Sequence, residues 1–95
     1  MNRDELISRR EEILRIAKQR GARRVRVFGS VARGEENSGS DVDFLVDFEP
    51  GRSLFDHGGL VMDLEELLGV KVDVLSERGL RTRFREGIEA EAVSL

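Results

Sequence analysis

The sequence is 95 residues long, which predicts one domain over residues 1–95 and excludes a multidomain protein. Its 39% of apolar residues suffice for a folded core, and the absence of cysteine excludes disulfides, a thiol nucleophile and a thiolate zinc site. A single histidine excludes a histidine-based metal cluster, and no apolar run approaches the ~20 residues that span a bilayer. We therefore expect a soluble, cytoplasmic protein with no membrane partner.

The net charge of −3 conceals an uneven distribution of charge. Residues 1–34 carry 10 Lys and Arg against 4 Asp and Glu, whereas residues 35–77 carry 2 against 12. This division disfavours a uniformly basic nucleic-acid binder. Arg23, Arg24 and Arg26 are best explained as a solvated basic face, and the five phenylalanines fall mostly at positions typical of a core, so no base-stacking surface accompanies them. Direct binding of nucleic acid is therefore not expected.

The first third of the chain predicts a helix followed by a short strand. Apolar residues recur at helical spacing over residues 4–20, with acidic side chains at the start and Gly21 just beyond the end. Valines alternate with arginines over residues 24–28, which is typical of a strand. A Gly-Ser turn follows, and residues 31–33 are expected to form a short helix.

The middle of the chain predicts a second strand and a second helix. Residues 42–48 form the clearest strand pattern, and Ser53 with Asp56 three positions later resembles a capping box. The helix that this box begins carries a leucine-rich face and ends at Gly69. We expect Leu54 and Phe55, at its start, to pack in the core rather than to form an exposed docking patch.

The last third predicts a third strand and a third helix. Valines alternate over residues 70–75, and Leu80, Phe84 and Ile88 follow at a spacing of four, as on one helix face. Residues 92–95 could form a last helical turn or a short edge strand, and the strand is favoured. The interleaved pattern predicts a small α/β (α+β) domain, with a mixed sheet of three to four strands and about three helices packed against it.

The sharpest local motif is a pair of aspartates at the start of the second predicted strand. Because side chains alternate along a strand, Asp41 and Asp43 share one face, while Val42, Phe44 and Val46 point into the core. Two close carboxylates raise each other's pKa, and Mg²⁺, which prefers oxygen ligands, removes that penalty. The alternative is a solvated strand end, which is the commoner explanation of an isolated Asp-x-Asp motif.

A Gly-Ser turn stands directly after the first predicted strand, and ten residues separate Ser30 from Asp41. Gly29 permits a tight exit from the strand and a close approach to a ligand. Ser30 supplies a hydroxyl at the start of a short helix, where free N–H groups can bind phosphate oxygens. The turn could therefore hold a triphosphate beside a metal, although an isolated Gly-Ser turn has no such meaning.

Asp73 is a third candidate, because it lies inside the third predicted strand between Val72 and Val74. A carboxylate at such a position is either buried at a cost or part of a polar site on the sheet. Beside the two earlier aspartates the functional interpretation is favoured. Asp73 would then be a ligand of a second metal ion or the base that deprotonates an attacking hydroxyl.

These motifs carry a family resemblance. Residues 28–34 read FGSVARG, residues 40–43 read SDVD, and Asp73 follows in a third strand. The pattern resembles the minimal nucleotidyltransferases (MntA-like) of the polymerase-β nucleotidyltransferase superfamily, and the likeness extends through residues 48–54, 67–73 and 91–93. The metal ligands and catalytic carboxylates that the resemblance implies are Asp41, Asp43 and Asp73. The nucleotide-binding residues that it implies are Gly29, Ser30 and Arg33.

The resemblance implies a Mg²⁺-dependent enzyme that transfers AMP from ATP to an acceptor. Members of this family usually pair with a HEPN-domain RNase toxin and act as its antitoxin, as in a type VII-like toxin–antitoxin system. The acceptor that it implies is a tyrosine of that toxin, with which the chain would form a hetero-oligomer.

Two alternatives stay open. A chain of this size must devote much of its surface to a partner, so it could be a non-catalytic antitoxin that neutralises the toxin by stoichiometric binding. Transfer to a small molecule such as an antibiotic is less favoured, because the extra substrate-binding domain of such enzymes is not found in the sequence.

Overall fold

The computed structural model describes residues 1–35, 41–80 and 82–95. Ser40, which belongs to the predicted aspartate motif, lies outside the described residues. In chain order the elements are α1 (Arg3–Ser8), α2 (Arg10–Gln19), β1 (Ala22–Phe28), α3 (Gly29–Ala32), β2 (Val42–Phe48), α4 (Leu54–Leu68), β3 (Val72–Ser76), the 3-10 helix η1 (Glu77–Gly79), α5 (Thr82–Glu91) and β4 (Val93–Ser94). None of the described helices has both the length and the apolar character of a membrane span.

The strands of the described residues form one mixed sheet in the order β3-β2-β1-β4. β1 runs antiparallel to both β2 and β4, whereas β2 and β3 are parallel. A parallel pair needs a crossover, and α4 supplies it. The predicted α/β fold with a small mixed sheet is confirmed, including the short edge strand at the C-terminal end.

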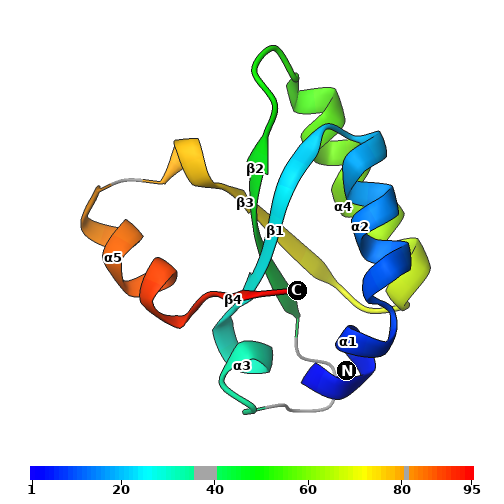
Figure 1. Ribbon diagram of the computed structural model, residues 1–95, viewed down its shortest axis with the longest axis vertical. Helices are drawn as coiled ribbons and strands as arrows, with labels where there is room; N and C mark the ends of the chain where they lie inside the picture. The colour runs from blue at the N-terminus through cyan, green and yellow to red at the C-terminus, as the bar shows by residue number, and fades with distance from the viewer. Residues whose placement is uncertain (36–40, 81) are drawn as a thin grey trace.

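The core lies between the sheet and two helices, α2 and α4, which run side by side along one face (Figure 1). Val42, Phe44 and Val46 of β2 point toward these helices and are fully buried, as predicted. Burial of each such side chain contributes roughly 1.5–3 kcal/mol. The alternate residues of β2 therefore face the opposite side of the sheet, where α5 lies in Figure 1.

Contacts between polar groups fix α2 against α4. The Arg20 guanidinium pairs with Asp63 at 2.8 Å, and a Cβ on Gly59 would come within 2.5 Å of the Arg20 guanidinium carbon. Gly59 costs helix stability, but its missing side chain leaves the space that this ion pair occupies. Both predicted ends of α4 are confirmed, with the Ser53 capping box at the start and Gly69 in the left-handed conformation at the end.

Two predictions about the elements are wrong. The single helix over residues 4–20 is two helices, because the chain leaves helical geometry at Arg9, whose N–H bonds to Leu6 and Ile7 carbonyls. With this division and the short helix α3, the described residues contain five α-helices. Leu80 lies after η1 and before α5, so it does not share a helix face with Ile88.

The apolar residues at the start of α4 also depart from expectation. Leu54 and Phe55 are 87% and 90% exposed, so they do not pack in the core. The capping box at Ser53 fixes the first turn of α4 so that these two side chains project away from the sheet. Together they form an exposed apolar patch on the surface.

Candidate active site

The sheet register brings two of the three predicted carboxylates side by side. Asp43 and Asp73 are each the second residue of their strand, β2 and β3, and they pair directly in the parallel register. Asp41 immediately precedes β2 and is exposed, whereas Asp43 is half-buried. The residue paired with Asp43 on the other side is Phe28, the last residue of β1. The end of β1 therefore lies beside the start of β2.

This register joins the Gly-Ser turn to the aspartate pair. Gly29 follows Phe28 with φ of +78°, and a Cβ at this position would collide with the Asp43 carboxylate oxygen Oδ2 and lie 3.1 Å from Asp43 Cγ. Glycine is required both by the backbone conformation and by the approach of the carboxylate. Residues that stand 14 positions apart in the sequence thus form one continuous site.

The charge around Asp43 is only partly balanced. Burial raises the pKa of Asp43, and the nearby carboxylates of Asp73, Asp41 and Glu91 raise it further. The Arg33 guanidinium acts in the opposite direction. A bound cation stabilises the ionised form of a carboxyl group that lies among like charges.

Metal binding would require these carboxylates to move closer together. Within residues 1–35, 41–80 and 82–95, no group of three or more His, Cys, Asp or Glu side chains is arranged to hold a metal ion. The donor chemistry nevertheless fits Mg²⁺, because the cluster offers carboxylate oxygens from adjacent strand positions whose charge is only partly balanced.

Ser30 differs from Gly29 in that its donors make no hydrogen bond to the other described residues. It lies in the first turn of α3, and among the described residues neither its hydroxyl nor its amide donates a hydrogen bond. The other two predicted nucleotide-binding residues, Gly29 and Arg33, already donate hydrogen bonds to carboxylates. The Gly29 N–H donates to Glu91 Oε1 at 2.9 Å, and Arg33 donates from Nη1 to Glu91 Oε2 at 2.8 Å and from Nε to Glu35 at 3.0 Å.

Glu91 is the residue that the sequence analysis did not place in the site. It is the last residue of α5, and the hydrogen bond from Arg33 lowers the pKa of its carboxyl, with a further contribution from the Gly29 N–H. In the sequence Glu91 is one of 19 acidic residues, and no spacing links it to position 29. Only the family likeness of residues 91–93 pointed to this segment.

One arginine of β1 is not part of a solvated basic face. Arg26 is only 7% exposed and pairs with Glu77 at 3.2 Å, whereas Arg23 and Arg24 are exposed as expected. The expectation for Arg26 was wrong because alternation alone does not show that acidic side chains from η1 and α5 cover this residue. Arg26 Nε and Glu77 Oε2 are buried without a hydrogen-bond partner among the described residues.

The chain is similar in sequence to known proteins. The family model described as a nucleotidyltransferase domain matches residues 10–95. A protein of Methanocaldococcus jannaschii that is named as a protein adenylyltransferase is 40% identical over 86 residues, which cover 90% of this chain and 92% of the relative. The protein adenylyltransferase MntA of Thermococcus cleftensis is 42% identical over 73 residues, which cover 77% of this chain and 74% of MntA.

Solved structures give the same fold. A structure described as a minimal nucleotidyltransferase is 55% identical, with a TM-score of 0.90, and the match covers 100% of this chain and 97% of the other. A toxin–antitoxin structure with AMP-PNP is 19% identical with a TM-score of 0.77, over 88% of this chain and 69% of the other, and so shows the fold alone.

The comparisons confirm the resemblance, the fold and the prediction of an enzyme of the nucleotidyltransferase class. The matched residues include β1, the Gly-Ser turn, β2 and β3, which together build the site described above. The chain therefore belongs to the nucleotidyltransferase domain family.

Proposed function

We propose that this chain is a Mg²⁺-dependent protein adenylyltransferase that transfers AMP from ATP to a tyrosine of a partner HEPN toxin and so acts as its antitoxin. The observation that carries the proposal is the meeting of Gly29, Asp43 and Asp73 at one end of the sheet. The names of two relatives, both protein adenylyltransferases, support the reaction. A single domain over residues 1–95 and a cytoplasmic location belong to the same proposal.

The residues divide the work of the proposed reaction between them. Ser30 would bind phosphate oxygens through its hydroxyl and amide, which donate no hydrogen bond to the other described residues. Asp41, Asp43 and Asp73 would hold the divalent cations, which would supply positive charge beside the phosphates when bound. The tyrosine oxygen forms a bond to the α-phosphorus, the α–β phosphoanhydride bond breaks, and pyrophosphate leaves. Asp73 is either a further metal ligand or the base that accepts the tyrosine proton.

The test uses α-labelled ATP, Mg²⁺ and a HEPN-domain protein of the same organism as the candidate partner. Label should appear on one tyrosine of the partner, as identified by mass spectrometry, and should be lost when Asp41 and Asp43 are both replaced by Ala. Asp47→Ala is the matched control, since Asp47 lies on the same strand and the same face as Asp43. No transfer by the wild type, or transfer retained by the double variant, contradicts the proposal.

The exposed patch of Leu54 and Phe55 favours a second candidate, an antitoxin that masks its partner by stoichiometric binding. The two candidates differ in what the double variant of Asp41 and Asp43 does in cells. Relief of toxicity by the folded double variant at ordinary expression would support masking. Loss of relief with retained folding would support catalysis.

A further inference from the structure

The last residue of α5 binds the Gly-Ser turn with both of its carboxylate oxygens. Glu91 Oε1 accepts from the Gly29 N–H at 2.9 Å, and Oε2 accepts from Arg33 Nη1 at 2.8 Å. Gly29 and Arg33 are the first residue of α3 and the residue that caps its end. One carboxylate therefore spans both ends of the helix that begins with the turn, through two charge-assisted hydrogen bonds.

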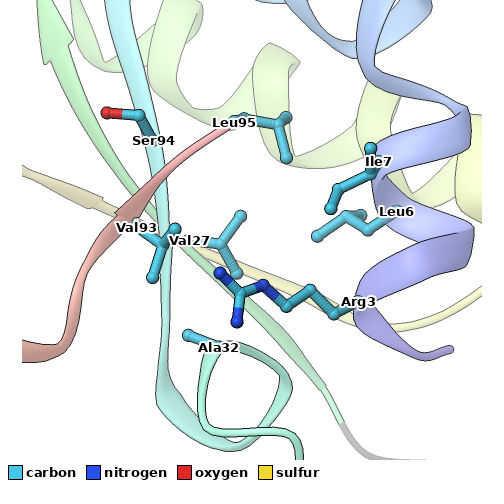
Figure 2. Close-up of a pocket in the computed structure, with 8 residues that line it drawn as sticks. All are labelled: Arg3, Leu6, Ile7, Val27, Ala32, Val93, Ser94 and Leu95. Carbon is cyan, nitrogen blue, oxygen red and sulfur yellow. The ribbon is translucent and has the colours of Figure 1, made fainter.

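The chain on both sides of Glu91 is anchored, so this carboxylate has little freedom to leave. On one side the Ala92 N–H bonds to the Ile88 carbonyl at 3.0 Å and continues α5. On the other side Val93 pairs with Val27 of β1. Figure 2 shows Val93 and Leu95 beside a small cavity of about 40 Å³, on the side of the sheet toward α1.

Within the Gly-Ser turn some donors are hydrogen-bonded to carboxylates and others are not. Glu91 occupies the Gly29 N–H and one nitrogen of Arg33, and Glu35 occupies another nitrogen of Arg33 at 3.0 Å. Ser30, between them, keeps its hydroxyl and amide free of hydrogen bonds to the other described residues. The hydrogen bonds of Gly29 and Arg33 would fix the conformation of the turn, and the donors of Ser30 would bind a ligand.

We propose that Glu91 is a positioning residue for nucleotide binding, which holds Gly29 and Arg33 so that Ser30 presents its donors to the phosphates. The inference rests on the proposed function and adds a residue from the C-terminal segment to its site. It also reassigns Arg33 from phosphate contact to support of the turn. The Gly29 backbone lies so close to the Asp43 carboxylate that a Cβ there would collide with Oδ2, so a hydrogen bond that fixes the Gly29 amide also fixes the backbone against which Asp43 lies.

If Glu91 competed with the nucleotide instead of positioning the turn, its removal would change nucleotide affinity in the opposite direction. If the Glu91 carboxylate were a substitute for a phosphate and had to be displaced by ATP, its removal would tighten nucleotide binding. If it positions the turn, its removal weakens binding, because the turn must then be ordered by the nucleotide itself. The sign of the change in affinity therefore separates the two.

The experiment compares the wild type with Glu91→Ala and Glu91→Gln. Calorimetry measures the dissociation constant of a non-hydrolysable ATP analogue, with Mg²⁺ and again with chelator. We expect about tenfold weaker binding for Glu91→Ala, and an intermediate value for Glu91→Gln, which keeps an acceptor for the Gly29 N–H but loses the charge that pairs with Arg33. The control is Glu86→Gln, an exposed residue of the same helix, which should bind as the wild type does.

Two further measurements exclude a merely structural effect. The ¹H–¹⁵N resonance of the Gly29 amide should shift in both Glu91 variants without nucleotide and stay in place in Glu86→Gln. In transfer assays KM for ATP should rise about tenfold while kcat changes less than about threefold. Glu91→Gln preserves size and polarity, so it reports even if Glu91→Ala does not fold.

Unchanged or tighter nucleotide binding in a folded Glu91 variant overturns the inference. So does a Gly29 resonance that does not move. Failure of the proposed function gives a different result, because the wild type would then bind no nucleotide and transfer no AMP. A wild type that binds and transfers, beside Glu91 variants that do so equally well, removes the positioning role alone.

Discussion

Replacement of Gly29 by alanine should damage the site more than it damages the fold. At φ of +78° a Cβ meets two costs, the left-handed backbone and the collision with Asp43 Oδ2. Gly34 separates the two costs, because it has a similar φ of +75° and no atom of the described residues lies within 4 Å of where its Cβ would be. Gly34→Ala should therefore cost the backbone term alone, about 1–2 kcal/mol of unfolding free energy.

The collision adds a second term in Gly29→Ala. The Asp43 carboxylate must leave its preferred rotamer, which costs about 0.5–1.5 kcal/mol, so the total should reach about 1.5–3.5 kcal/mol. Displacement by about 1 Å of a group that acts in the reaction can cost roughly 100-fold in rate. AMP transfer should therefore fall about 100-fold in Gly29→Ala and stay near the wild-type rate in Gly34→Ala.

Urea unfolding at 25 °C gives the free energies, provided that the m-value is unchanged. The same two substitutions in an Asp43→Ala background test the cause, since removal of the carboxylate should make Gly29→Ala and Gly34→Ala equally costly. Equal costs in the wild-type background, or a difference that persists without the Asp43 carboxylate, would refute this reasoning.

Three further substitutions test the electrostatics and the surface. Asp43→Asn should raise the melting temperature in chelator at pH 7, because the raised pKa of Asp43 means that its ionised form destabilises the fold. This gain in melting temperature should vanish as the pH falls through the ordinary range of aspartate, where the Asp43 carboxyl is protonated in both the folded and the unfolded chain. A gain that persists below pH 3 would contradict this. Arg26→Ala should cost about 3 kcal/mol in urea unfolding, because it leaves the mostly buried Glu77 carboxylate with only its 3.9 Å contact to Arg24. Arg24→Ala removes only that exposed contact and should cost less than about 0.5 kcal/mol. Phe55→Ser, at a side chain that is 90% exposed, should leave the unfolding free energy within about 0.5 kcal/mol of the wild type, and a larger loss would show that the patch is not free.

The elements that the sequence predicts well are those with a local physical signal. The boundaries of β2 follow from its alternation and its flanking turn, and the ends of α4 follow from the Ser53 capping box and Gly69. Arg9 carries no such signal, because arginine is a good helix former and nothing near it breaks a helix. Its side chain instead reaches the Leu67 carbonyl in α4 at 3.3 Å, a tertiary contact that periodicity does not show.

The candidate site divides in the same way. Spacing and residue type make four site residues recognisable in the sequence, namely Gly29, Ser30, Asp41 and Asp43. The pairing of Asp43 with Asp73 depends on strand order and register, which the three-strand pattern leaves open. Glu91 is farther still from a sequence signal, because its role depends on where the edge strand β4 returns to β1.

The buried pair of Arg26 and Glu77 shows the same limit. Both residues look like ordinary surface charges in the sequence, and alternation along β1 places Arg26 on the face away from the core. The burial arises because η1 and α5 fold back over that face, as Figure 1 shows for α5. Coverage by a later segment is a tertiary property that composition and periodicity do not contain.

The central claim is that the site breaks the α–β bond of ATP and transfers AMP. The most direct measurement uses ATP labelled in parallel at the α- and the γ-phosphate, with Mg²⁺ and the HEPN partner. The account predicts α-label on the partner, γ-label only in released pyrophosphate, and neither with the double alanine variant of Asp41 and Asp43. Transfer of the γ-label to the partner, or no transfer of either label by the wild type, would contradict it.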